Sequence, residues 1–143
     1  MDTTGMDTGS TFAVCYAESG GDASALWEDS AIRVQVVKLT TVTYLSTRSM
    51  KSSTIPVTSA VVPQVTNMSL VYSGILGTGQ WLSLVDMSLN SNNPCVVGSI
   101  AAHVADTAHS GPLQAASGTK EITIPQVPLM DASATFTVCY AEG

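Results

Sequence analysis

The three cysteines are the side chains of this chain that are best suited to covalent chemistry. Cys15, Cys95 and Cys139 form no Cys-x-x-Cys pair and no Cys/His cluster, which a zinc site would need. Their other ordinary chemistry is the disulfide, which forms in oxidising compartments such as the extracellular space. The sequence therefore predicts a disulfide and no metal site, and a buried free thiol is the alternative.

The two histidines are the other side chains that could do chemistry. His103 and His109 flank Asp106, so a Ser-His-Asp arrangement is conceivable. However, no Gly-x-Ser-x-Gly elbow or other nucleophile context accompanies them. We therefore predict no catalytic residues, no cofactor and no enzymatic activity.

An internal repeat relates two of the cysteines. Residues 6–18 (MDTGSTFAVCYAE) return as residues 130–142 (MDASATFTVCYAE), with nine of thirteen positions identical and no gap. Cys15 and Cys139 are equivalent, so one intact unit would contain Cys95 and a single motif cysteine. Within a chain we expect the disulfide Cys95–Cys139, with Cys15 free or paired elsewhere.

The composition is typical of a secreted, β-rich protein. Apolar residues make up 45% of the 143 residues and charged residues only 11%, while Ser and Thr account for 35 of 143. The net charge of −6, with five Lys and Arg residues, argues against nucleic acid as a partner. The longest apolar stretch, 95–105, is too short to span a membrane. From this composition we expect an extracellular protein, and Asn67-Met68-Ser69 is then an N-glycosylation sequon that would carry covalent glycans.

Short β-branched and aromatic runs between turn residues predict an all-β fold, a sandwich or a barrel. Sustained helical periodicity is nearly absent. We expect the first copy of the repeat to form a two-strand hairpin, with residues 12–18, a turn and then the run from Ala31 onward. Within this second run, Ile32, Val34 and Val36 share one face. The expected strands lie near residues 11–18, 31–45, 54–61, 67–73, 80–89, 95–104, 112–116, 120–126 and 134–142.

The segment Asp131–Ala141 resembles the sixth strand of immunoglobulin domains, where an Asp-Ser-Ala lead-in precedes an aromatic strand that carries a cysteine. The chain departs from that pattern at Thr137, where the family has a tyrosine. In its hydroxyl-rich composition and repeated motif, the chain looks like the glycosylated immunoglobulin-like fibrils of microbial surfaces and environmental waters. In such fibrils, the extended N-terminal strand of one protomer completes the sandwich of the next.

This resemblance implies an antiparallel immunoglobulin-like sandwich with an N-terminal donor strand. We expect residues 1–47 to be an extension and residues 48–143 to be a sandwich that lacks its last strand. The expected donor strand runs over 31–43 and carries Ile32, Val34 and Val36, with Trp27 as an anchor before it. The expected acceptor edge carries Phe136, Val138 and Tyr140. The implied function is that of a structural subunit of an extracellular filament, whose partners are other copies of itself.

Two other functions fit the sequence. An immunoglobulin-like adhesin or carbohydrate-binding module could stack a sugar on Trp81 and Tyr72, which lie near a glycine-rich turn that we expect to form a hairpin. A viral capsid or fibre protein shares the same β-rich, hydroxyl-rich composition.

Overall fold

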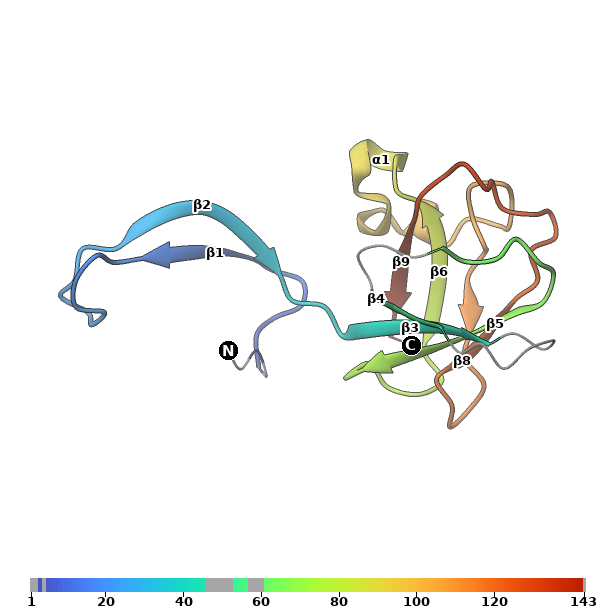
Figure 1. Ribbon diagram of the computed structural model, residues 1–143, viewed down its shortest axis with the longest axis horizontal. Helices are drawn as coiled ribbons and strands as arrows, with labels where there is room; N and C mark the ends of the chain where they lie inside the picture. The colour runs from blue at the N-terminus through green and yellow to red at the C-terminus, as the bar shows by residue number, and fades with distance from the viewer. Residues whose placement is uncertain (1–2, 4, 46–52, 57–60, 143) are drawn as a thin grey trace. The chain divides into compact units, whose positions relative to one another are not determined.

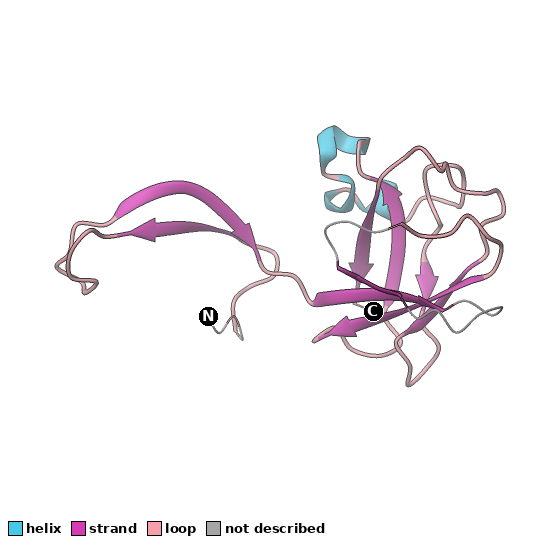
Figure 2. Cartoon of the chain, in the orientation of Figure 1, coloured by secondary structure: helices cyan, strands magenta, loops and turns pink. Residues whose placement is uncertain are grey.

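The computed structural model describes residues 3, 5–45, 53–56 and 61–142 and consists mostly of β-strands in antiparallel sheets (Figures 1 and 2). The chain divides into two compact parts, Met1–Lys38, here called unit 1, and Leu39–Gly143, called unit 2. Among the described residues, no helix is long and apolar enough to cross a membrane.

Unit 1 is built around an antiparallel hairpin of β1 (Thr11–Tyr16) and β2 (Glu28–Gln35), as expected from the first copy of the repeat (Figure 1). Phe12 pairs with Val34 near one end of the hairpin, and Tyr16 pairs with Glu28 at the other. The tyrosine hydroxyl also donates to a Glu28 carboxylate oxygen at 2.8 Å. The hairpin therefore identifies the residue of β2 that lies opposite each of five residues of the repeated motif.

The register of the hairpin shifts between Ala13 and Cys15, opposite an irregular stretch of β2. Ala31 in this stretch has a left-handed φ of 61°, an uncommon conformation for a residue with a side chain. The Ser30 hydroxyl donates to the Val14 carbonyl at 2.6 Å. This bond gives the carbonyl a partner where the ladder is interrupted, which is how a β-bulge is accommodated.

Unit 2 contains two antiparallel sheets, one of four strands in the order β4-β3-β5-β8 and one of three in the order β7-β6-β9 (Figure 1). The strands of the first sheet are β3 (Leu39–Leu45), β4 (Ser53–Pro56), β5 (Met68–Gly74) and β8 (Glu121–Ile124). The strands of the second sheet are β6 (Trp81–Asp86), β7 (Leu113–Gln114) and β9 (Phe136–Ala141).

Both sheets contribute to a single hydrophobic core. In β5, the alternation of side chains between the two faces buries Met68, Leu70 and Tyr72. The same alternation in β8 buries Ile122 and Ile124. The second sheet adds Leu82 and Leu84 of β6, with partly buried side chains of β9 packed against them. One core shared by two sheets makes unit 2 an independently packed body.

The start of unit 2 differs from the expected boundary between residues 47 and 48. The run 31–45, expected as one strand, is broken at 36–38, and Leu39–Leu45 pairs with β4 and β5. Leu39 and Val42 are only 4% and 6% exposed, so this strand belongs to the core of its own unit. The donor segment expected over 31–43 is therefore too long, because its last residues are already used inside unit 2.

The segment expected as a strand over 95–104 forms short helical turns instead. These are α1 (Leu89–Asn92), η1 (Pro94–Val96) and α2 (Gly98–Ala101). Asn90 has a positive φ of 48°, and Pro94 stands in the first turn of η1, where its missing N–H costs nothing. An apolar run of this length does not by itself distinguish a strand from helical turns.

Candidate functional site

Strand β9, which contains the second copy of the repeat, lies at the edge of the three-stranded sheet. It pairs on one side with β6, with Tyr140 opposite Leu82 and Val138 opposite Leu84. Within the described ranges, no strand pairs with its other side. Such an edge is a template for a further strand unless it is protected. The structure thus places the expected acceptor strand at a sheet edge.

The expected acceptor side chains point toward the core rather than outward. Phe136, Val138 and Tyr140 are partly buried and pack against the hydrophobic cluster of unit 2. Because directly opposed residues share a face of the sheet, a strand added beside β9 would place its own alternate residues next to these three. The added strand would extend the existing core.

The two copies of the repeat also share their local structure. The Gly9 N–H donates to a carboxylate oxygen of Asp7 at 2.9 Å, and the equivalent Ser133 N–H donates to Asp131 at 2.8 Å. A hydroxyl, from Ser10 in the first copy and Ser133 in the second, also donates to the aspartate at 2.7 Å. These hydrogen bonds hold the pKa of both aspartates below the ordinary value, and the bond from the backbone N–H has the largest effect. The repeat is therefore a structural unit, an Asx turn followed by a strand.

A third copy of this turn precedes β2 and was not recognised in the sequence. The Ser24 hydroxyl and N–H donate to a carboxylate oxygen of Asp22 at 2.7 and 2.9 Å, and these two bonds lower the pKa of the aspartate. The signal that could have revealed it is the tetrapeptide Asp-Ala-Ser-Ala, which occurs at both 22–25 and 131–134. Asp22 is thus part of the device that leads the chain into a strand.

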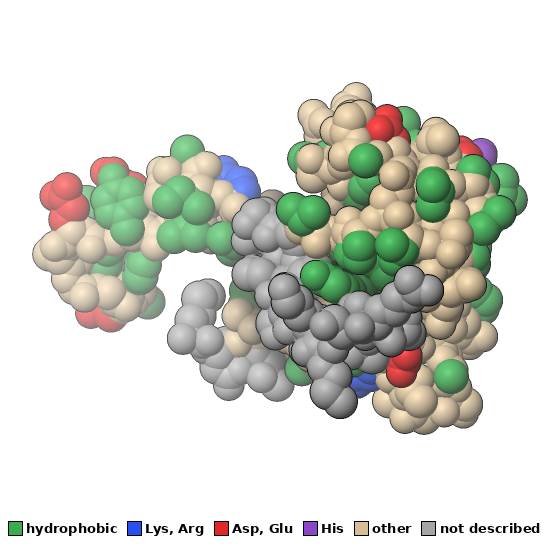
Figure 3. All heavy atoms as spheres, turned by 45° about the vertical axis from the view of Figure 1, so that its right-hand side comes forward, with side chains coloured by type: hydrophobic (Ala, Val, Ile, Leu, Met, Phe, Trp, Pro, Cys, Tyr) green, Lys and Arg blue, Asp and Glu red, His purple; other side chains and the backbone are tan. Residues whose placement is uncertain are grey.

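Seven large apolar side chains of unit 1 are exposed among the described residues. In Figure 3, patches of hydrophobic side chains are visible on the hairpin. The exposed residues are Val14, Tyr16, Leu26, Trp27, Ile32, Val34 and Val37. Val14 and Tyr16 are the equivalents of Val138 and Tyr140, which pack on the core in unit 2. The same motif is therefore covered in one copy and exposed in the other, a pattern that indicates an interaction surface.

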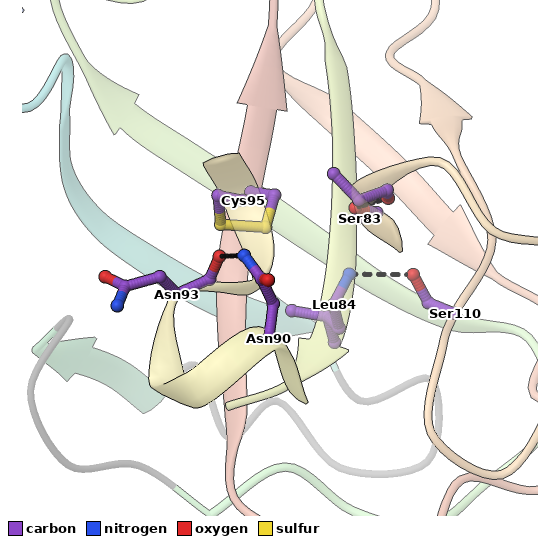
Figure 4. Close-up of a disulfide and its surroundings, with 8 residues drawn as sticks. Ser83, Leu84, Asn90, Asn93, Cys95 and Ser110 are labelled. Carbon is purple, nitrogen blue, oxygen red and sulfur yellow. Dashed lines mark hydrogen bonds between the residues drawn. A yellow bond between two sulfur atoms is a disulfide. The ribbon is translucent and has the colours of Figure 1, made fainter. Parts of the chain in front are cut away.

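The disulfide expected from the repeat is present. Cys95 in η1 is bonded to Cys139 in β9, with 5.3 Å between the Cα atoms, and Figure 4 shows it joining the helical turns to the strand. Among the described cysteines, Cys15 is a free, exposed thiol. The Ser83 hydroxyl of β6 donates to the Ala101 carbonyl at 2.5 Å, a second link between the helical turns and the sheet.

An apolar pocket of about 270 Å³ lies on this disulfide-bearing face of the three-stranded sheet. Strand residues 81–83 and 139–141 line one side of it, and residues of η1 and α2 contribute to the rest of the lining. Pairing places Trp81 opposite Ala141 and Ser83 opposite Cys139, so these four residues lie on the face opposite to that of Leu82 and Tyr140. We call this the outer face.

His103, Asp106 and His109 come together in one loop. Their potential ligand atoms all lie within 4.8 Å of one another, and the Asp106 carboxylate accepts from the Ala108 N–H at 2.7 Å and contacts the His109 Nδ1 at 2.8 Å. Partial desolvation opposes ionisation of Asp106, but hydrogen bonds led by that from His109 outweigh it and lower its pKa. The His109 Nε2 is buried and has no hydrogen-bond partner among the described residues, whereas a metal-bound histidine normally donates from its second nitrogen. The hydrogen bonds of Asp106 with Ala108 and His109 therefore fit a structural role, in which they order this loop.

Tyr72 cannot take part in the sugar stacking considered for it and Trp81, whereas Trp81 is 37% exposed. Tyr72 is 2% exposed, and its hydroxyl donates to the Gly77 carbonyl at 2.7 Å, so its ring belongs to the core. The turn near Trp81 connects β5 and β6, which lie in different sheets, and so it is not the hairpin turn that the glycines suggested.

The expected glycosylation residue, Asn67, is exposed and immediately precedes β5.

Comparison with known proteins found no match to the chain among protein-family models, curated proteins or solved structures.

Proposed function

We propose that this protein is a structural subunit of an extracellular filament, in which each copy lacks the last strand of an immunoglobulin-like sandwich and receives it from another copy. The observation that carries the proposal is the strand order of unit 2 together with the repeat. The proposal assigns no catalytic role to the chain.

The strand order supports an immunoglobulin-like arrangement. In that fold, strands A, B and E are neighbours in one sheet, and C′, C, F and G are neighbours in the other. Within the order β4-β3-β5-β8, the strands β3-β5-β8 correspond to A-B-E, and β4 is an additional strand beside A. The order β7-β6-β9 corresponds to C′-C-F. Strand G is the neighbour of F, so the position left for it is the edge of β9.

The repeat identifies β2 as the strand that belongs at this edge. In the first copy the motif strand is β1, and the strand that follows it and pairs with it is β2. Since β9 is the second copy of the motif, β2 already has a sequence that pairs with such a strand. In the hairpin register, Val34 lies opposite Phe12, the equivalent of Phe136, so Val34 would face the core of unit 2.

Donation of β2 to another copy makes a head-to-tail contact. Each copy offers one donor strand and one acceptor edge, which are different surfaces, so the contact can propagate without closing and yields a filament. The hydroxyl-rich composition and the intramolecular disulfide are compatible with an extracellular location.

Covalent trapping of the paired strands tests the proposal. Arg33 lies opposite Ala13 in the hairpin, and the repeat equivalent of Ala13 is Thr137. A variant with Arg33→Cys and Thr137→Cys in a Cys15→Ser background is therefore expected to give a ladder of disulfide-linked multimers on non-reducing electrophoresis. Reducing agent should collapse the ladder to a monomer.

The variant that carries only Thr137→Cys with Cys15→Ser is the matched control and should give no species longer than a dimer. A cross-linked product that runs only as a monomer would mean that the strand is donated within one chain. Absence of any cross-link, together with a monomeric wild type by sedimentation, would overturn the filament proposal.

We also propose that Asn67 carries a glycan in the native protein. Its side chain is exposed at a turn, where an acceptor asparagine is accessible. The intact mass of native material is therefore expected to exceed the peptide mass of 14.8 kDa, and Asn67→Gln should remove the N-linked part of the excess. A native mass equal to the peptide mass would exclude the modification.

A further inference from the structure

We propose that Trp27 of one copy inserts into the outer-face pocket of the next, beside the end of β9. The inference rests on the proposed donation of β2 and adds the contact that anchors the donated strand. The occupant of the pocket is thus a second copy of this chain.

The hairpin register predicts where Trp27 would lie. Cys15 pairs with Asp29 and Tyr16 with Glu28, the last pair of the ladder. Extending this register by one residue beyond the ends of β1 and β2 places Trp27 opposite Ala17. The repeat equivalent of Ala17 is Ala141. If β2 exchanges its partner β1 for β9 of another copy and keeps this register, Trp27 lies opposite Ala141.

In this register, Trp27 also projects from the face of the sheet on which the pocket lies. Directly opposed residues of an antiparallel pair project from the same face of the sheet. Ala141 lines the pocket on the outer face, together with Trp81 and Cys139. Trp27 would therefore project onto the face that carries the pocket, whereas Val34 projects onto the core face.

The properties of the pocket and of the tryptophan are complementary. The lining is mostly apolar, and the volume of about 270 Å³ lies just below the roughly 300–1,000 Å³ of small-molecule sites, which suits a single large side chain. Trp27 is 52% exposed in the free chain, although its indole N–H donates to the Asp22 carbonyl at 3.0 Å. The exchange of β1 for β9 conserves the strand pairing and gains the burial of this exposed ring.

Two substitutions test the inference. Trp27→Ala is expected to weaken association of the full chain by at least about thirtyfold, as for a central aromatic anchor, measured by sedimentation across a concentration series. Leu26→Ala is the matched control, because Leu26 is the neighbouring apolar residue and is 89% exposed, and it should associate as the wild type does.

Fluorescence supplies an independent measurement. The chain has two tryptophans, Trp27, which would insert into the pocket, and Trp81, which lines the pocket and would be covered. The emission of the wild type should therefore move to shorter wavelength when the protein assembles. Normal assembly of Trp27→Ala, or an unchanged emission in wild-type filaments, would overturn the pocket contact. If Trp27→Ala assembles normally but Val34→Asp does not, strand donation stands without the pocket contact. If Val34→Asp also assembles normally, both proposals are wrong.

Discussion

Removal of the Cys95–Cys139 disulfide is expected to lower the free energy of unfolding of unit 2 by about 4 kcal/mol. The bond closes a sequence separation of 44 residues, and in the chain-entropy estimate such a cross-link limits the conformations of the unfolded chain by about that amount. For a unit of this size, the melting temperature should fall by roughly 15–20 °C.

The measurement is reversible denaturation of Cys95→Ser with Cys15→Ser, compared with Cys15→Ser alone. The second substitution is needed because the exposed Cys15 thiol could otherwise pair with the released Cys139. Cys15→Ser by itself should leave the stability of unit 2 unchanged, since this residue lies in unit 1. A loss of less than about 1 kcal/mol in the double variant would contradict the stabilising role.

The repeat allowed the main parts of the candidate site to be predicted from the sequence. Two similar strands in one chain should have similar neighbours, so the first copy predicted the hairpin with β2. Because Cys15 and Cys139 occupy equivalent positions of the repeat, each intact unit has one motif cysteine and Cys95, which predicted the Cys95–Cys139 disulfide. The edge position of β9 followed from the same comparison.

Other parts of the fold depend on contacts that a single sequence does not reveal. The break at 36–38 contains Val36, Val37 and Lys38, with no Gly or Pro to mark it, so the continuous β-branched run concealed the start of β3. The turns over 89–101 are set by left-handed residues and by a disulfide to a distant strand. The outer-face pocket exists only because those turns cover the sheet, and so no sequence pattern indicated it.

The exposed hairpin explains why association would be favourable without new backbone pairing. Strand β2 has a partner in the free chain, so the exchange of β1 for β9 leaves the number of ladder hydrogen bonds nearly unchanged. What changes is the environment of the apolar side chains of β2, which are exposed in unit 1 and would be covered beside β9. The driving force for association is therefore burial of apolar surface. A charge placed on the core-facing side of β2 should disrupt the association.

Val34→Asp is accordingly expected to abolish filament formation. Burial of a valine contributes roughly 1.5–3 kcal/mol, and an unpaired carboxylate in the same place costs several kcal/mol more. Association should weaken by at least about a thousandfold, measured by sedimentation and negative-stain microscopy.

In the free hairpin Val34 is 38% exposed, and it lies outside unit 2, so the melting of unit 2 should not change. Gln35→Asp is the matched control, because it adds the same charge at the next position of β2, on the face that points away from the core. Gln35→Asp should therefore assemble. If Val34→Asp polymerises as readily as Gln35→Asp, β2 is not the strand that joins one copy to the next.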